Sequence, residues 1–158
     1  MNKDKQKDFV RRISQANKTE LVAITFEIIV ENINAAEETL NKEDILGFRT
    51  ELKMAQKALG ELISSLDFNY PISKELLQLY EYVQKILVSS DISGKDRGLE
   101  SAKNVMKGLG ASFSEIASQD TSESVMANTQ QIYAGLTYGK GTLNESDIAA
   151  GSNRGFLA

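Results

Sequence analysis

The stretch from Ser64 to Ser73 constrains the fold more than any other part of the chain, because it joins two long helical patterns by a very short link. It contains Pro71, the only proline in the sequence. One pattern ends at Leu66, and the next begins near Ile72 or Ser73, where a proline's missing N–H would have no helical partner anyway. A link this short permits only a tight reversal. We therefore predict two antiparallel helices that lie side by side.

Four segments of the chain carry apolar residues at helical spacing. They predict helices over residues 18–40, 42 or 43–66, 73–89 and 95–118. Asn17 followed by Glu20 is typical of a capping box and marks the start of the first helix. Four helices of this length with short links predict an all-α, up-down-up-down antiparallel four-helix bundle over residues 17–118.

The first of these helices carries two neighbouring apolar stripes instead of one. The first stripe contains Val22, Phe26, Ile29, Ile33, Ala36 and Leu40, and the second contains Leu21, Ile24, Ile28 and Ala35. Together the stripes cover an arc of roughly 200°, whereas a helix at the edge of a bundle buries an arc of about 100°. Either this helix is the most central one, or part of the second stripe forms a groove for a partner.

Two tyrosines, Tyr80 and Tyr82, flank the core stripe of the third helix on opposite sides. In one interpretation each ring packs on the bundle and keeps its hydroxyl in water. In the other, one of them lines a partner groove, because tyrosine is enriched in interface hot spots. In the fourth helix, Gly108 and Gly110 interrupt the apolar seam, which indicates close helix approach or local pliancy.

The two ends of the chain differ from the bundle. Residues 1–16 form a basic arm with a weak amphipathic pattern, and we expect a flexible segment that frays or docks as a short helix. Residues 119–158 are rich in Gly, Ser and Asn, which predicts a largely irregular tail. Within the tail, residues 125–138 carry enough aromatic and aliphatic side chains to predict a docking segment, with a disordered tail as the alternative.

Composition excludes several kinds of chemistry. The chain has no Cys, His or Trp, which excludes disulfides, thiol nucleophiles, histidine catalysis and nearly all zinc sites. No paired carboxylates stand out inside an apolar stripe, so we expect no enzyme, no metal site and no cofactor. The 22 acidic residues exceed the 18 basic ones, which argues against nucleic acid as the main partner.

The distribution of apolar residues predicts a soluble, cytoplasmic protein. No apolar run approaches the roughly 20 residues that a membrane span requires. Residues 1–20 are charged and lack the apolar run of a signal peptide. We therefore expect no contact with a membrane.

The centre of the chain resembles the flagellar secretion chaperone family (FliS). The resemblance rests on Leu62-Ile63-Ser64-Ser65-Leu66-Asp67, then Ile72-Ser73, then Leu76-Leu77-Gln78-Leu79-Tyr80-Glu81-Tyr82-Val83. It extends to Asn17-Lys18-Thr19-Glu20-Leu21 and spans about residues 9 to 117. The chain departs from the family at Thr25-Phe26-Glu27-Ile28, where members commonly have Leu-Tyr-Asp-Gly.

The resemblance implies a cytoplasmic export chaperone. The family binds the C-terminal segment of flagellin, keeps it from polymerising early and delivers it for export. By resemblance, the N-terminal arm covers the groove when no client is bound. From the geometry of the helix faces we assign the partner-binding role to Leu21, Ile24, Ile28, Tyr80 and Tyr82.

Two further questions stay open at this point. The alternative function is a non-catalytic helical bundle that self-associates or binds another flagellar factor, and the protein is either a monomer or a weak homodimer. We also hypothesise that residues 125–138 dock in the client groove as a built-in competitor.

Overall fold

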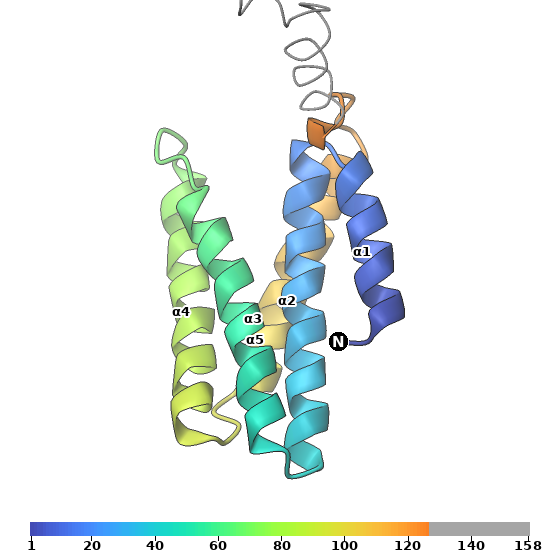
Figure 1. Ribbon diagram of the computed structural model, residues 1–158. Helices are drawn as coiled ribbons and strands as arrows, with labels where there is room; N and C mark the ends of the chain where they lie inside the picture. The colour runs from blue at the N-terminus through green and yellow to red at the C-terminus, as the bar shows by residue number, and fades with distance from the viewer. Residues whose placement is uncertain (127–158) are drawn as a thin grey trace, which may run out of the picture.

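The computed structural model describes residues 1–126 of the 158-residue chain. Within this range the protein contains five α-helices and no strand, so the all-α prediction is confirmed. The helices are α1 (Lys3–Gln15), α2 (Lys18–Asn41), α3 (Ile45–Ser64), α4 (Ile72–Ser93) and α5 (Leu99–Ala117). Helix α2 packs against α1, α3 and α5, while α4 packs against α3 and α5 (Figure 1).

The start of α2 is fixed by the predicted capping box. The Asn17 side-chain oxygen accepts a hydrogen bond from the backbone N–H of Glu20 at 2.9 Å. The Glu20 carboxylate in turn accepts one from the backbone N–H of Asn17 at 3.0 Å. Two otherwise unpaired backbone donors are satisfied in this way, which explains why the helix begins at Lys18 as predicted.

The link between α3 and α4 is organised by Asp67. Its backbone carbonyl accepts hydrogen bonds from the Ser73 hydroxyl at 2.6 Å and from the Tyr70 N–H at 3.1 Å. Helix α4 begins at Ile72, directly after Pro71, as predicted. Helix α3 ends at Ser64, two residues before the predicted end.

Helix α3 begins at Ile45, later than the predicted residue 42 or 43, because its cap is Asp44. The Asp44 carboxylate accepts a hydrogen bond from the backbone N–H of Gly47 at 2.9 Å. A Cβ atom on residue 47 would lie 2.2 Å from this carboxylate, so the cap requires glycine there.

The link between α4 and α5 lies further along the chain than predicted. Helix α4 continues to Ser93, four residues beyond the predicted end, and α5 begins at Leu99 instead of residue 95. Ser90 was predicted to lie in the link, but it is a fully buried residue of α4. Its hydroxyl accepts a hydrogen bond from the backbone N–H of Arg97 at 3.0 Å. Gly94, with a φ of 68°, ends α4 in the left-handed conformation that glycine favours.

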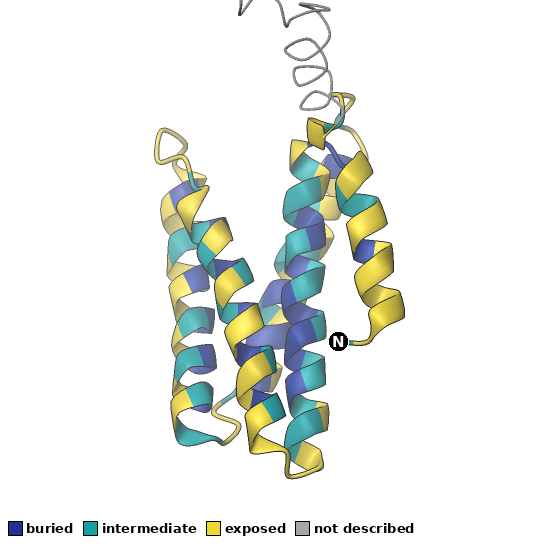
Figure 2. Cartoon of the chain, in the orientation of Figure 1, coloured by how far each residue is buried: buried dark blue, intermediate teal, exposed yellow. Residues whose placement is uncertain are grey.

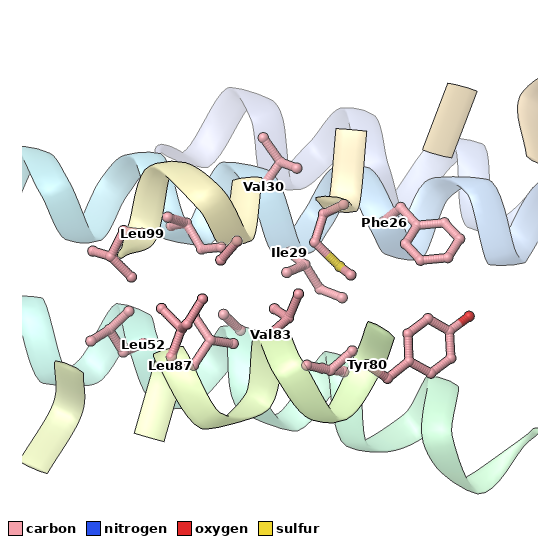
Figure 3. Packing of buried hydrophobic residues seen from close by; sticks show 14 of the residues in the cluster. Phe26, Ile29, Val30, Leu52, Tyr80, Val83, Leu87 and Leu99 are labelled. Atoms are coloured by element: carbon pink, nitrogen blue, oxygen red, sulfur yellow. The ribbon is translucent and has the colours of Figure 1, made fainter. Parts of the chain in front are cut away.

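The main hydrophobic core lies among α2, α3, α4 and α5 (Figure 3). The first apolar stripe of α2 points into it, and Figure 3 shows Ile29 in the middle of the cluster with Phe26 beside Tyr80 at one end. Its fully buried members include Phe26, Ile29, Ile33, Phe48, Leu52, Leu59, Tyr80, Val83, Leu87, Leu99 and Met106.

The N-terminal segment is not a free arm in the structure. Most of it forms the 13-residue helix α1, which lies along α2 and exposes most of its surface (Figure 2). Of the two expectations for residues 1–16, the structure therefore shows the short docked helix and not the flexible arm. At the other end, the predicted irregular tail and the predicted docking segment 125–138 fall almost entirely outside the described residues.

Candidate functional site

Helix α1 covers the second apolar stripe of α2. Phe9 of α1 and Ile24 of α2 are only 8% and 5% exposed, and they form a second hydrophobic cluster that is separate from the main core. Leu21 and Ile28 of α2 pack against this cluster, as does Ile13 of α1. The structure thus brings together three of the five predicted site residues and shows that the chain's own N-terminal helix lies over them.

The two tyrosines do not lie at this stripe. Tyr80 is only 2% exposed and belongs to the main core, where its ring centroid lies 6.1 Å from that of Phe26. Burial raises the pKa of Tyr80 to about 12. Tyr82 is 48% exposed on α4, a helix that packs on α3 and α5. Tyr80 is therefore a core residue and not a flanking one, while the exposure of Tyr82 fits the predicted flanking position.

Two ion pairs connect α1 to α2. Lys5 pairs with Glu31, and both terminal nitrogens of Arg12 donate to the Glu27 carboxylate, at 2.5 and 3.1 Å. The hydrogen bond to Glu27 is the main reason that the pKa of Arg12 is raised. Exposed ion pairs contribute only about 0–1 kcal/mol each. Phe9 is the one buried residue of α1, and the partly buried Ile13 packs beside it, so few apolar side chains hold this helix on α2.

Two clefts lie between α1, α2 and α5. The larger has a volume of about 600 Å³, and its apolar lining includes Phe9, Phe26, Val30, Met106, Gly110 and Ala111. The smaller has a volume of about 340 Å³, and its lining includes Ala16, Ala23, Ile24 and Ala117. Arg12, Glu27 and Ser114 line both clefts.

Gly110 allows α5 to approach α2 beside the larger cleft. A Cβ atom at Gly110 would lie 3.2 Å from the Cβ atom of Phe26, whereas one at Gly108 would meet open space. Close helix approach therefore explains Gly110 but not Gly108. The sequence marks Gly110 only as an interruption of the apolar seam, and the charges of Arg12 and Glu27 form no pattern distinct from a solvent-exposed helix face.

The segment after α5 packs on the junction between α1 and α2. The Asp120 carboxylate accepts a hydrogen bond from the Thr19 hydroxyl at 2.6 Å, and the Val125 N–H donates to the Ala16 carbonyl at 3.0 Å. The bond from Thr19 is the main reason that the pKa of Asp120 is lowered. Ala16 and Asn17, the two residues between the helices, are both buried.

Within residues 1–126, no group of three or more acidic side chains is placed to hold a metal ion. In the same range, no helix combines the length and the apolar character needed to cross a membrane. The surface formed by α1, α2 and α5 has an apolar floor and charges of both signs at its rim.

Comparison with known proteins gives a match to a protein family. The model of the family described as "Flagellar protein FliS" matches residues 1–120, a range that includes all five helices. A search of curated proteins finds no match.

Proposed function

Because the chain belongs to the FliS family of flagellar proteins, we propose that it is a cytoplasmic export chaperone for flagellin. In this role it binds the C-terminal helical segment of flagellin, prevents premature polymerisation and supports secretion during assembly of the flagellum.

The observation that carries the proposal is the second apolar stripe of α2 beneath a weakly held helix. Leu21, Ile24 and Ile28 form an apolar surface outside the main core, and α1 covers it. An amphipathic client helix can lay its apolar face on the same surface, which is the helix-in-groove mode of recognition. In the absence of a client, α1 keeps this surface out of water.

We also propose the finer architecture that the sequence predicts, in which α2–α5 form an antiparallel up-down-up-down bundle. The ring of packed pairs supports it, since α2 contacts α3, α3 contacts α4, α4 contacts α5 and α5 contacts α2. Short links between successive helices favour antiparallel neighbours.

Calorimetry with a flagellin peptide tests the function directly. The full chain is titrated with a peptide of roughly 40 residues from the C-terminus of the same organism's flagellin, and one-to-one binding with a negative heat-capacity change is expected because apolar surface is buried. Concentration-dependent self-association without any affinity for the peptide would contradict the proposal and favour the self-associating bundle.

Ile24→Asp locates the binding surface. A charge on the second stripe opposes burial of an apolar helix face, so we expect the affinity for the peptide to fall at least about tenfold. Ile92→Asp controls for the added charge, because Ile92 is an exposed isoleucine on α4 that lines neither cleft. Equal affinities of the two variants would place the client elsewhere.

Tyr82→Ala then tests whether the surface that the flagellin peptide contacts extends to α4.

A further inference from the structure

The two clefts beside α1 are parts of one trough. Both lie between α1 and α5 with α2 as the floor, and they share Arg12, Glu27 and Ser114. The ion pair between Arg12 and Glu27 therefore divides a single depression into a larger and a smaller part. The lining runs from Met106 of α5 to Ser118, the C-cap of this helix, which corresponds to about 18 Å, or more than three turns.

The larger part of the trough is open while α1 is docked. Its floor is apolar, because Phe26 and Val30 of α2 and Met106 of α5 lie beneath it as buried core residues, and Ala111 is exposed at the side. A volume of about 600 Å³ lies within the range of sites that hold drug-sized groups, so several apolar side chains fit. The rim carries Lys107 of α5 together with acidic and basic side chains of α1 and α2.

The trough is continuous with the surface that α1 covers. Phe9 lines the larger cleft and Ile24 lines the smaller one, and both belong to the second hydrophobic cluster. A helix that occupies the trough therefore lies directly beside the covered stripe. The apolar floor and the mixed charges of the rim match a helix with an apolar stripe between polar flanks.

Building on the proposed function, we propose that this trough is where the flagellin segment first binds, before α1 leaves. Apolar side chains of the client helix enter the larger cleft while α1 is still docked. The client then breaks the Arg12–Glu27 pair, extends into the smaller cleft and replaces α1 on the second stripe. The α1 helix is displaced by a client that is already bound, so binding does not wait for spontaneous opening of the cover.

Ala111→Trp tests this order of events, because an indole at this exposed position fills the larger cleft from its side. The matched control is Ser112→Trp, which places the same group on the next exposed residue, outside the lining of either cleft. Association of the full-length variants with the flagellin peptide is measured by stopped-flow fluorescence. We expect the association rate constant to fall at least about tenfold for Ala111→Trp and to change less than about twofold for Ser112→Trp.

The dependence on peptide concentration gives a second readout. If the client binds before α1 opens, the closed chain shows a fast phase whose rate keeps rising in proportion to the peptide concentration, followed by a slower phase in which α1 is displaced. If α1 must open first, no phase of the closed chain is faster than the opening step. A reaction of the unchanged chain that never exceeds the rate of opening would overturn the proposed order.

The outcomes separate this inference from the proposed function. Equal association rates for the two tryptophan variants, or a change only in the dissociation rate of Ala111→Trp, would overturn the first-contact role while leaving flagellin binding intact. Failure of the unchanged chain to bind the peptide would overturn the proposed function itself. Ala111→Glu, which places a charge in the same cleft with less bulk than an indole, gives the same slow association if the inference is correct. Thermal melts verify that each variant is folded.

Discussion

Tyr80 illustrates, for a single residue, how burial changes a titratable group. Its pKa is raised from 10.0 to about 12 because the phenolate form is desolvated. A group with a raised folded-state pKa contributes stability that is full below its unfolded pKa and is lost as the pH rises through the folded value. Stability linked to Tyr80 is therefore present below pH 10.0 and is lost toward pH 12.

We expect an absorbance titration of the tyrosines to show a late phase near pH 12 that belongs to Tyr80. Tyr80→Phe should remove this phase, because the substitution removes the ionisable hydroxyl. Tyr82→Phe is the control, since Tyr82 is half exposed and should leave the late phase in place. The same late phase in Tyr80→Phe would show that another tyrosine carries it.

The pKa of Asp120 is shifted in the opposite direction to that of Tyr80. Its pKa lies below 3.8, chiefly because the Thr19 hydroxyl donates a hydrogen bond to the carboxylate. Its contribution to stability is therefore present above pH 3.8 and is lost as the pH falls through the lower folded-state value. NMR of the side-chain carboxyl carbon should show Thr19→Val moving the midpoint upward. Thr25→Val, whose hydroxyl donates to the Leu21 carbonyl, should leave the midpoint unchanged.

At the scale of one helix, the two glycines inside α5 should respond differently to alanine. Gly108→Ala meets open space, so it should stabilise the protein by about 0.5–1 kcal/mol through better helix propensity. Gly110→Ala places a methyl group 3.2 Å from the Phe26 Cβ atom, so crowding should remove this gain and destabilise the protein. Chemical denaturation measures both effects, and equal stabilisation by the two substitutions would show that α5 can move away from α2.

The hold of α1 on α2 depends mainly on Phe9. Removing a buried phenylalanine side chain typically costs about 3–5 kcal/mol. We expect Phe9→Ala to release α1 while α2–α5 stay folded, and the apparent affinity for the flagellin peptide to rise at least about threefold because the open state becomes more populated. Val10→Ala is the control, because Val10 is 67% exposed on the same helix. Unchanged affinity in Phe9→Ala would show that α1 does not compete with the client.

Across the whole molecule, the two hydrophobic clusters should open separately. The main core joins α2–α5, whereas α1 contributes only to the second cluster. Elements with few buried contacts open at low free energy. Native-state hydrogen exchange should therefore show the amides of α1 exchanging at least about a hundredfold faster than those at the centre of α2. Equal protection of the two helices would mean that they unfold as one unit.

Helical periodicity, capping and proline chemistry predicted much of this architecture. The start of α2 at Lys18 and of α4 at Ile72 followed from local chemistry, namely the Asn17–Glu20 box and Pro71. The boundaries that differ depend on contacts far along the chain. Ser90 stays helical because it is buried and bonded to Arg97, and no local pattern reveals this bond.

The candidate site was predictable only on the α2 side. The spacing of Leu21, Ile24 and Ile28 identified a second apolar stripe on α2. The helix that covers this stripe, α1, lies in a basic segment and contributes one aromatic residue, Phe9, to the contact. Tyr80 was assigned to a partner surface because it lies beside the core stripe, and it is buried because Phe26 comes within ring contact. The clefts form where α5 meets α1 and α2, so the periodicity of one helix could not indicate them.

The bonds between residues 120–125 and the α1–α2 junction also have a mechanical consequence. Tension applied from the C-terminal side reaches the Val125–Ala16 and Asp120–Thr19 bonds before it reaches α5. These bonds hold Ala16, which lies between α1 and α2, and Thr19 in the first turn of α2, whereas the main core lies beyond the five turns of α5. We therefore expect a pull in this direction to loosen α1 before it loads the main core, so that force on the C-terminal side would act first on the proposed binding surface.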